Sequence, residues 1–236
     1  MATAGFWAFV GASSLILGAL IALSGRLQGK PLGLLIGFGG GALVSALAYD
    51  LFGEAVEASA TGLTVAVGFV AGAVTYYVGD EIIDRMAGSQ SAKGGGGLPL
   101  LLGAVLDGIP ESIVLGLTLV AGGPSVAILV AIFISNVPES VAGSTRMLET
   151  GRQPAWIIGA WTLVACAGAL AAAIGYGLLA TASGDVIALI DAFAAGAILT
   201  LLANELFPAA HAESNRLVGL ATAAGFAVAV FLSLNA

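Results

Sequence analysis

Two related motifs, each rich in oxygen-bearing side chains, lie within apolar sequence near the middle of the chain. One reads Asp107-Gly-Ile-Pro-Glu-Ser and the other reads Ser135-Asn-Val-Pro-Glu-Ser. On a helix, Asp107 and Glu111 project from one face because they are four residues apart. Ser135 and Glu139 share that spacing. The proline in each motif has no amide donor, so one backbone carbonyl loses its helical partner. The motifs therefore predict clustered oxygen atoms in an apolar environment.

Three of these side chains are acids, which are costly inside a bilayer. A carboxylate near the bilayer centre costs about 2.5–3.5 kcal/mol on insertion scales, so Asp107, Glu111 and Glu139 together cost roughly 8–10 kcal/mol. We place the nearest basic residue, Arg146, at the connection that follows the second motif, and so expect no basic partner. The offsetting charge is then a bound cation, or protons that turn the acids into neutral hydrogen-bonding groups between helices.

The composition of the chain is that of a polytopic membrane protein. Of its 236 residues, 59% are hydrophobic and 9% are charged, and the mean hydropathy is +1.06. The net charge of −7 argues against nucleic acid as a partner. The single cysteine, Cys166, excludes an intrachain disulfide. The first 25 residues contain no Lys or Arg, so we expect a spanning helix there and no signal peptide.

Eight apolar segments are long enough to cross a bilayer, and we expect an all-α membrane protein with one domain over residues 1–236. The fourth and fifth segments form a central hairpin that brings the two motifs to similar depth. The predicted spans are 4–24, 32–57, 61–84, 98–120, 125–147, 155–180, 186–208 and 216–234.

The basic residues predict the orientation of these spans. All fall in or next to alternate connections, those after the first, third, fifth and seventh segments. By the positive-inside rule these connections are cytoplasmic and both termini lie outside a cell membrane, plasma or inner. The residues are Arg26, Lys30, Arg85, Lys93, Arg146, Arg152 and Arg216.

An internal repeat is also visible. Residues 38–52 align with residues 193–207, and the match includes Asp50 against Glu205. The second and seventh segments that contain these stretches run in opposite directions. We therefore expect an inverted repeat of three helices on each side of the hairpin, a 3+2+3 arrangement typical of transporters with a site at mid-membrane.

The repeat also predicts the depth of further polar residues. Asp50 and Glu54 lie toward the outer end of the second segment. Asn204, Glu205 and His211 lie toward the inner end of the seventh. Together with the central motifs, they would form a stepped series of ligands across the membrane, as in a transport pathway.

These motifs resemble those of the ZIP (Zrt-, Irt-like) family of divalent-metal transporters. The fourth helix of that family carries His-Asn-x-Pro-Glu-Gly, its fifth a related Pro-Glu motif, and its seventh, in many bacterial members, His-Glu-x-x-Pro-Glu. The last appears here as Asn204-Glu-Leu-Phe-Pro-Ala. The resemblance spans nearly the whole chain and implies eight helices, both termini outside, a homodimer and transport of divalent metal.

Several residues depart from the family pattern. All motif histidines are replaced, by Asp107, Ser135 and Asn204, and Gly108 stands where the family has an Asn ligand. Carried over by position, the resemblance implies an outer guard, Asp50, and an inner exit, Glu205. The central ligands it implies are Asp107, Glu111, Asn136 and Glu139, with Ser135 as a further candidate.

An all-oxygen site changes the ion that is expected. Carboxylate, amide and hydroxyl oxygens suit harder cations such as manganese or ferrous iron, although zinc also accepts Asp and Glu. We therefore expect transport of a divalent cation of the zinc, manganese or iron class into the cytoplasm. We expect no enzymatic activity and no cofactor beyond the transported ion.

Two other classes of protein remain open. A ZIP-like protein could have lost metal transport and move another solute, or act structurally. An intramembrane aspartyl protease would use paired aspartates such as Asp50, after Tyr49, and Asp107. The Gly-x-Gly-Asp motif of such proteases is absent, because the chain reads Ala104-Val-Leu-Asp107. That class would also leave the repeated Pro-Glu motif unexplained.

Overall fold

The computed structural model of the chain describes residues 2–59, 61–87, 98–106, 108, 126–178 and 182–234. This part is helical and contains no strand, which confirms the predicted all-α class. Residues 98–106 are helical. The other elements are α1 (Ala2–Leu23), α2 (Lys30–Ser45), η1 (Ala46–Leu51), α3 (Phe52–Ala58), α4 (Gly62–Ala87), α6 (Val126–Glu149), α7 (Pro154–Leu178), α8 (Gly184–Leu201), η4 (Leu202–Leu206), α9 (Phe207–Ser214) and α10 (Leu217–Leu234).

Six of the described helical stretches are long and apolar enough to cross a membrane. Large apolar side chains also cover the outside of the bundle: Leu63, Leu163 and Leu220 are each 70% exposed or more. Such a surface is unfavourable in water and favourable in lipid. The chain is therefore a membrane-embedded helical protein. The six stretches are Thr3–Leu23, Lys30–Ala58, Gly62–Ile82, Pro154–Ile174, Gly184–Ser214 and Leu217–Leu234.

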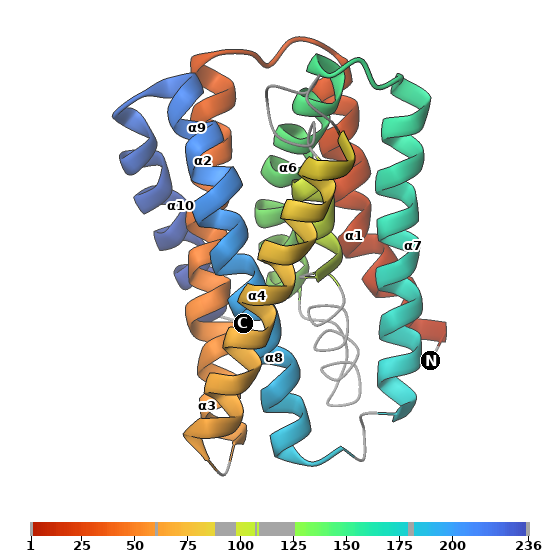
Figure 1. Ribbon diagram of the computed structural model, residues 1–236, viewed down its shortest axis with the longest axis vertical. Coiled ribbons are helices and arrows are strands. Elements are labelled where there is room, and N and C mark those ends of the chain that lie inside the picture. The colour runs from red at the N-terminus through yellow and green to blue at the C-terminus, as the bar shows by residue number, and fades with distance from the viewer. Residues whose placement is uncertain are drawn as a thin grey trace.

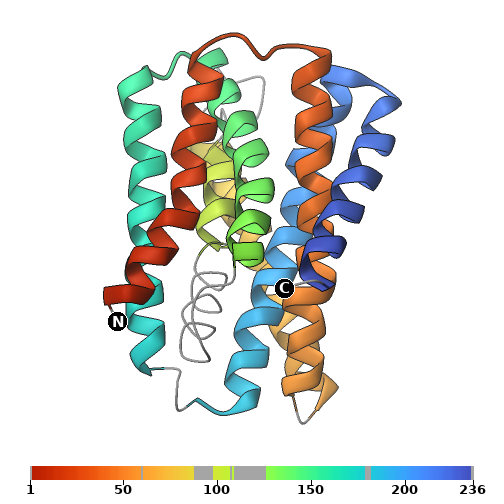
Figure 2. The same cartoon turned by 180° about the vertical axis from the view of Figure 1, so that it is seen from behind.

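The helices run roughly along one axis, with their connections at two ends (Figures 1 and 2). The α1–α2, α6–α7 and α9–α10 connections lie at the upper end of Figure 1, where α4 also finishes, and the α3–α4 and α7–α8 connections lie at the lower end. Every described basic residue belongs to an element that finishes or turns at the upper end, which we call the basic end. Of the seven lysines and arginines, Lys93 lies outside the described residues. The six described ones are Arg26, Lys30, Arg85, Arg146, Arg152 and Arg216.

Helix α6 occupies the interior of the bundle, where it contacts α1, α2, α7 and α10. Two glycines permit this close packing. A side chain at Gly18 of α1 would collide with Ser140, and one at Gly39 of α2 would collide with Pro138. Small residues let helices in membranes approach closely. The second Pro-Glu motif is thereby held at the centre of the described helices.

Two helix pairs flank this centre, and each is joined at a pair of glycines. A side chain at Gly41 or Gly225 would collide with the backbone where α2 meets α10. A side chain at Gly72 or Gly196 would do the same where α4 meets α8. The two interfaces are thus built alike, with backbone against backbone.

The end of α6 differs from the sequence prediction. We expected the fifth span to finish near residue 147, with Arg146 at the connection, whereas α6 continues to Glu149 and Arg146 lies in its last turn. The stop is set by Gly151, whose φ is 83°. There the amide of Arg152 donates to the Met147 carbonyl at 2.9 Å, as in a Schellman motif. Arg146 is therefore a helical residue that can face the bundle.

Candidate functional site

The second motif lies on α6 with its polar side chains buried. Ser135 is 4% exposed, Asn136 6%, and Glu139, near the middle of the helix, 1%. The reason is the position of α6, which has other helices on several sides. A carboxyl group so placed is costly in a membrane protein and marks functional sites by default. The polar side chains of the second motif thus lie inside the described bundle, and the predicted pairing with the first motif stays a prediction.

The serine hydroxyls of the motif donate to the helix backbone. Ser135 Oγ donates to the Ile132 carbonyl at 3.0 Å, and Ser140 Oγ donates to the Asn136 carbonyl at 2.9 Å. A hydroxyl that donates its proton in this way can still accept a hydrogen bond or coordinate a cation through its oxygen. Pro138 adds a further oxygen, because it has no amide to donate to the Ile134 carbonyl.

The first motif lies beyond what the structure describes. Both Asp107 and Glu111 fall in the gap, and Gly108 is described only as helical. Within the described ranges, no three His, Cys, Asp or Glu side chains come close enough to hold a metal ion. The described residues therefore supply one wall of the predicted centre, from α6, and the opposite wall stays a prediction.

Two π-helical segments interrupt the long helices at positions that carry predicted ligands. Asp50 lies in η1, between α2 and α3, and Glu205 lies in η4, between α8 and α9. Single π turns inside α-helices occur frequently at functional sites because they re-aim side chains. The sequence analysis did not predict these turns. The only signal was the repeat, since both segments fall within the aligned stretches 38–52 and 193–207.

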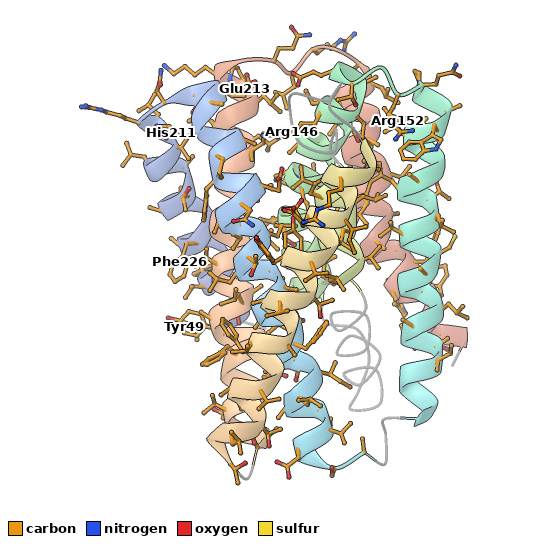
Figure 3. The ribbon with its side chains drawn as sticks, in the orientation of Figure 1. Tyr49, Arg146, Arg152, His211, Glu213 and Phe226 are labelled. Atoms are coloured by element: carbon orange, nitrogen blue, oxygen red, sulfur yellow. The ribbon has the colours of Figure 1, made fainter. Side chains whose placement is uncertain are left out.

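Glu205 has a basic partner that was not expected. Arg146 Nη1 lies 3.6 Å from Glu205 Oε2, and the two side chains are 29% and 13% exposed. The pair joins the last turn of α6 to η4, near the basic end of the bundle (Figure 3). The sequence analysis assigned no basic partner to Glu205, so this ion pair is a feature of the folded bundle alone. Asn204, beside it, is exposed.

At the opposite end, acidic residues gather where α3 packs against α8. Glu54 of α3 is exposed and interacts electrostatically with Asp191 of α8, which is 1% exposed. Asp191 Oδ2 has no hydrogen-bond partner among the described residues. Nearby, Ser59 Oγ donates to Asp185 at 3.2 Å. From the sequence, Asp191 is expected near the outer end of the seventh segment, either at the mouth of the path or at the surface.

His211 lies at the basic end on α9 and is exposed. It lines a pocket with Lys30 and Arg216, and the lining of that pocket includes no residue of the α6 motif. Figure 3 shows His211 toward the same end of the bundle as Arg146 and Arg152, whereas Phe226 and Tyr49 lie farther from that end. The predicted role of His211 as an exit ligand stays a prediction.

Neither a known protein-family model nor a curated protein matches the chain. The resemblance to metal transporters accordingly depends on the motifs themselves. What the described geometry offers chemically is a carboxylate, an amide and hydroxyl oxygens on one buried helix face, with acids near both ends of the bundle. Such groups can bind a hard or borderline divalent cation or a proton.

Proposed function

We propose that the chain is a transporter that carries divalent cations of the zinc, manganese or iron class across a cell membrane into the cytoplasm. The observation that carries this proposal is Glu139, 1% exposed near the middle of the innermost described helix, with Asn136 and Ser135 buried beside it. An acid in that place is costly unless a cation or proton offsets its charge. Arg146, in the last turn of the same helix, pairs with Glu205.

The proposed architecture has eight spanning helices: the six apolar stretches, α6, and a helix that begins with residues 98–106. Three observations support a 3+2+3 inverted repeat. The α2–α10 and α4–α8 interfaces correspond under the repeat, Gly41 aligns with Gly196 at these interfaces, and π turns occur at equivalent places in the two halves. Inverted repeats around broken or distorted helices are typical of transporters.

The proposed orientation puts the basic end in the cytoplasm and both chain termini outside. Basic connections are retained on the cytoplasmic side during membrane insertion. The α3–α4 and α7–α8 connections would then face the exterior, with Glu54 and Asp191 near the outer mouth. An acidic entrance raises the local concentration of cations.

In the proposed path, the central ion is bound between the two Pro-Glu motifs. Two or three carboxylates would bring a divalent ion close to neutrality, and weak binding at successive sites lets it leave as well as enter. The all-oxygen set favours manganese or ferrous iron and still admits zinc. The proposed ligands are Asp107, Glu111, Ser135, Asn136 and Glu139 at the centre, Asp50 and Glu54 outside, and Asn204, Glu205 and His211 inside.

Because its motifs resemble those of the ZIP family, we propose that the chain is a divergent member of that family and works as a homodimer. The competing possibility is a relative that has lost metal transport. The two differ in whether a divalent ion binds at the motif, because an ion that binds only the folded state raises its stability.

Metal-dependent thermal unfolding in detergent separates these possibilities. Manganese, zinc or cadmium should raise the unfolding temperature of the parent protein, and Glu139→Ala should abolish the rise. Glu149→Ala is the matched control, because Glu149 lies on the same helix but is exposed at its end. If no divalent ion shifts the parent, or if Glu139→Ala responds as the parent does, the proposed binding site is wrong.

A further inference from the structure

A pocket of about 580 Å³ opens at the basic end, where α2 begins and where α9 gives way to α10. Its polar lining combines Lys30 from the first residue of α2 with Arg216 from the α9–α10 turn, and His211 adds an imidazole. Glu213 is the single carboxylate in the lining. Two permanent cations against one acid leave the basic pocket, as we call it, net positive.

Two further features of the basic pocket point to an anion. Ser214 is 4% exposed and lines the pocket, yet its hydroxyl has no hydrogen-bond partner among the described residues. The sixteen-residue helix α2 begins at Lys30, and no side chain caps its first turn, in which Pro31 has no amide but Lys30 does. Amides at a helix N-terminus and a free hydroxyl both bind phosphate oxygens. The polar groups of the pocket thus match a phosphate.

An apolar groove of about 590 Å³ adjoins the basic pocket. Leu217 lines both, and Pro31 follows Lys30 directly. The groove lies between α2 and α10 and is lined by successive turns of α2 as far as Phe38, opposite Leu220. At 1.5 Å per residue, the α2 wall is about 10 Å long. A groove of this length and polarity fits part of an acyl chain.

We infer that the basic pocket and the apolar groove together bind one anionic phospholipid, with its phosphate in the pocket and an acyl chain in the groove. Charge complementarity and the continuity of the two spaces carry the inference, because a soluble anion would leave the groove empty. Basic pockets between membrane helices on the cytoplasmic side are known places for acidic lipid head groups. The inference needs the membrane placement; the pocket shares His211 with the proposed inner ligands of the metal path but contains none of the central ligands.

The test uses the full-length protein purified in detergent and lipids with identical acyl chains. Phosphatidylglycerol should raise the unfolding temperature more than phosphatidylcholine does, and native mass spectrometry should show the anionic lipid retained on the protein. Each basic residue near an acidic lipid contributes about 1 kcal/mol, which is about fivefold in affinity. In the double variant Lys30→Gln/Arg216→Gln, affinity for phosphatidylglycerol should therefore fall about 30-fold.

Arg85→Gln/Arg152→Gln is the matched control. It removes the same charge from the same end of the bundle but outside the pocket lining, and should bind phosphatidylglycerol like the parent. Equal loss of affinity in the two double variants would show a diffuse charge effect and overturn the site.

Inorganic phosphate should not reproduce the stabilisation that phosphatidylglycerol gives. If it does so at similar occupancy, or if phosphatidylcholine binds equally well, a lipid-specific site is excluded. Because no metal is added, failure here leaves the proposed transport untouched.

Discussion

At the scale of single residues, Glu139 is the group whose presence most needs a physical reason. Glutamine would fill nearly the same space at position 139, keep the hydrogen-bonding capacity and avoid placing a charge inside the bundle. A carboxylate at mid-membrane costs about 2.5–3.5 kcal/mol on insertion scales. A buried acid, at 1% exposure, is therefore explained by a bound cation more readily than by packing.

This reasoning predicts opposite effects of Glu139→Gln with and without metal. Without divalent ions, the variant should unfold at the same temperature as the parent or higher, because the cost of burying the acid is removed. With manganese or zinc, it should lack the stabilisation seen in the parent. Thermal unfolding in both conditions measures this. A variant that is destabilised without metal, yet still responds to metal, would show that the carboxyl group only joins helices.

The Arg146–Glu205 pair gives a second prediction at this scale. At 3.6 Å and with both side chains largely buried, loss of either partner leaves a charge without its counterion, which costs more than the pair itself contributes. Arg146→Gln and Glu205→Gln should each destabilise by about 1–3 kcal/mol. The double variant should lie closer to the parent than either single one. Additive losses, measured by a double-mutant cycle, would mean that the two side chains do not interact.

At the scale of elements, the sequence predicted where the helices lie better than how they bend. The aligned stretches 38–52 and 193–207 each run from an α-helix through a π-helical segment, and their relation by an inverted repeat stays a prediction. Their π turns, η1 and η4, were missed, because apolar periodicity does not reveal one extra residue in a turn. The end of α6 also differed: Gly151 stops the helix by its positive φ, and α6 ends at Glu149, two residues beyond the predicted end. Such stops depend on local backbone geometry more than on hydrophobicity.

The glycine interfaces allow a prediction at this scale. Gly41→Ala and Gly196→Ala should each destabilise by about 1–3 kcal/mol or prevent folding, since the added methyl group meets backbone of the facing helix. Gly159→Ala in α7 is the control, because a methyl group there meets nothing within 4 Å. That change should be neutral or slightly stabilising. Yield of monodisperse protein and thermal unfolding provide the comparison, and equal effects at all three positions would refute the close-approach explanation.

At the scale of the whole molecule, charge is distributed between the two ends of the bundle. Basic connections gather at one end and acidic groups near the α3–α8 contact at the other. The sequence predicted this, because basic residues recur at alternate connections and the helices must reverse between them. The ion pair of Glu205 could not be predicted. Its partner, Arg146, is close only because α6 and η4 meet in the folded bundle.

The orientation that follows is testable by cysteine labelling in intact cells. In a Cys166→Ser background, a membrane-impermeant thiol reagent should label Thr61→Cys and Ser183→Cys from outside. Gln28→Cys and Gln153→Cys should be labelled only after the membrane is opened, because they flank the basic connections. All four native residues are exposed at the ends of the bundle. Labelling from outside at Gln28→Cys or Gln153→Cys would reverse the orientation.

The most direct measurement is uptake of manganese into sealed vesicles that contain the purified protein, followed with an entrapped metal-sensitive dye. We expect uptake by the parent and by Glu149→Gln, and a loss of about tenfold or more in Glu139→Gln, the fold-change that corresponds to about 1.4 kcal/mol. Zinc and ferrous iron, tested in parallel, should show the same dependence on Glu139. Uptake by Glu139→Gln at the parent rate, or no uptake of any divalent ion by the parent, would contradict the proposed function.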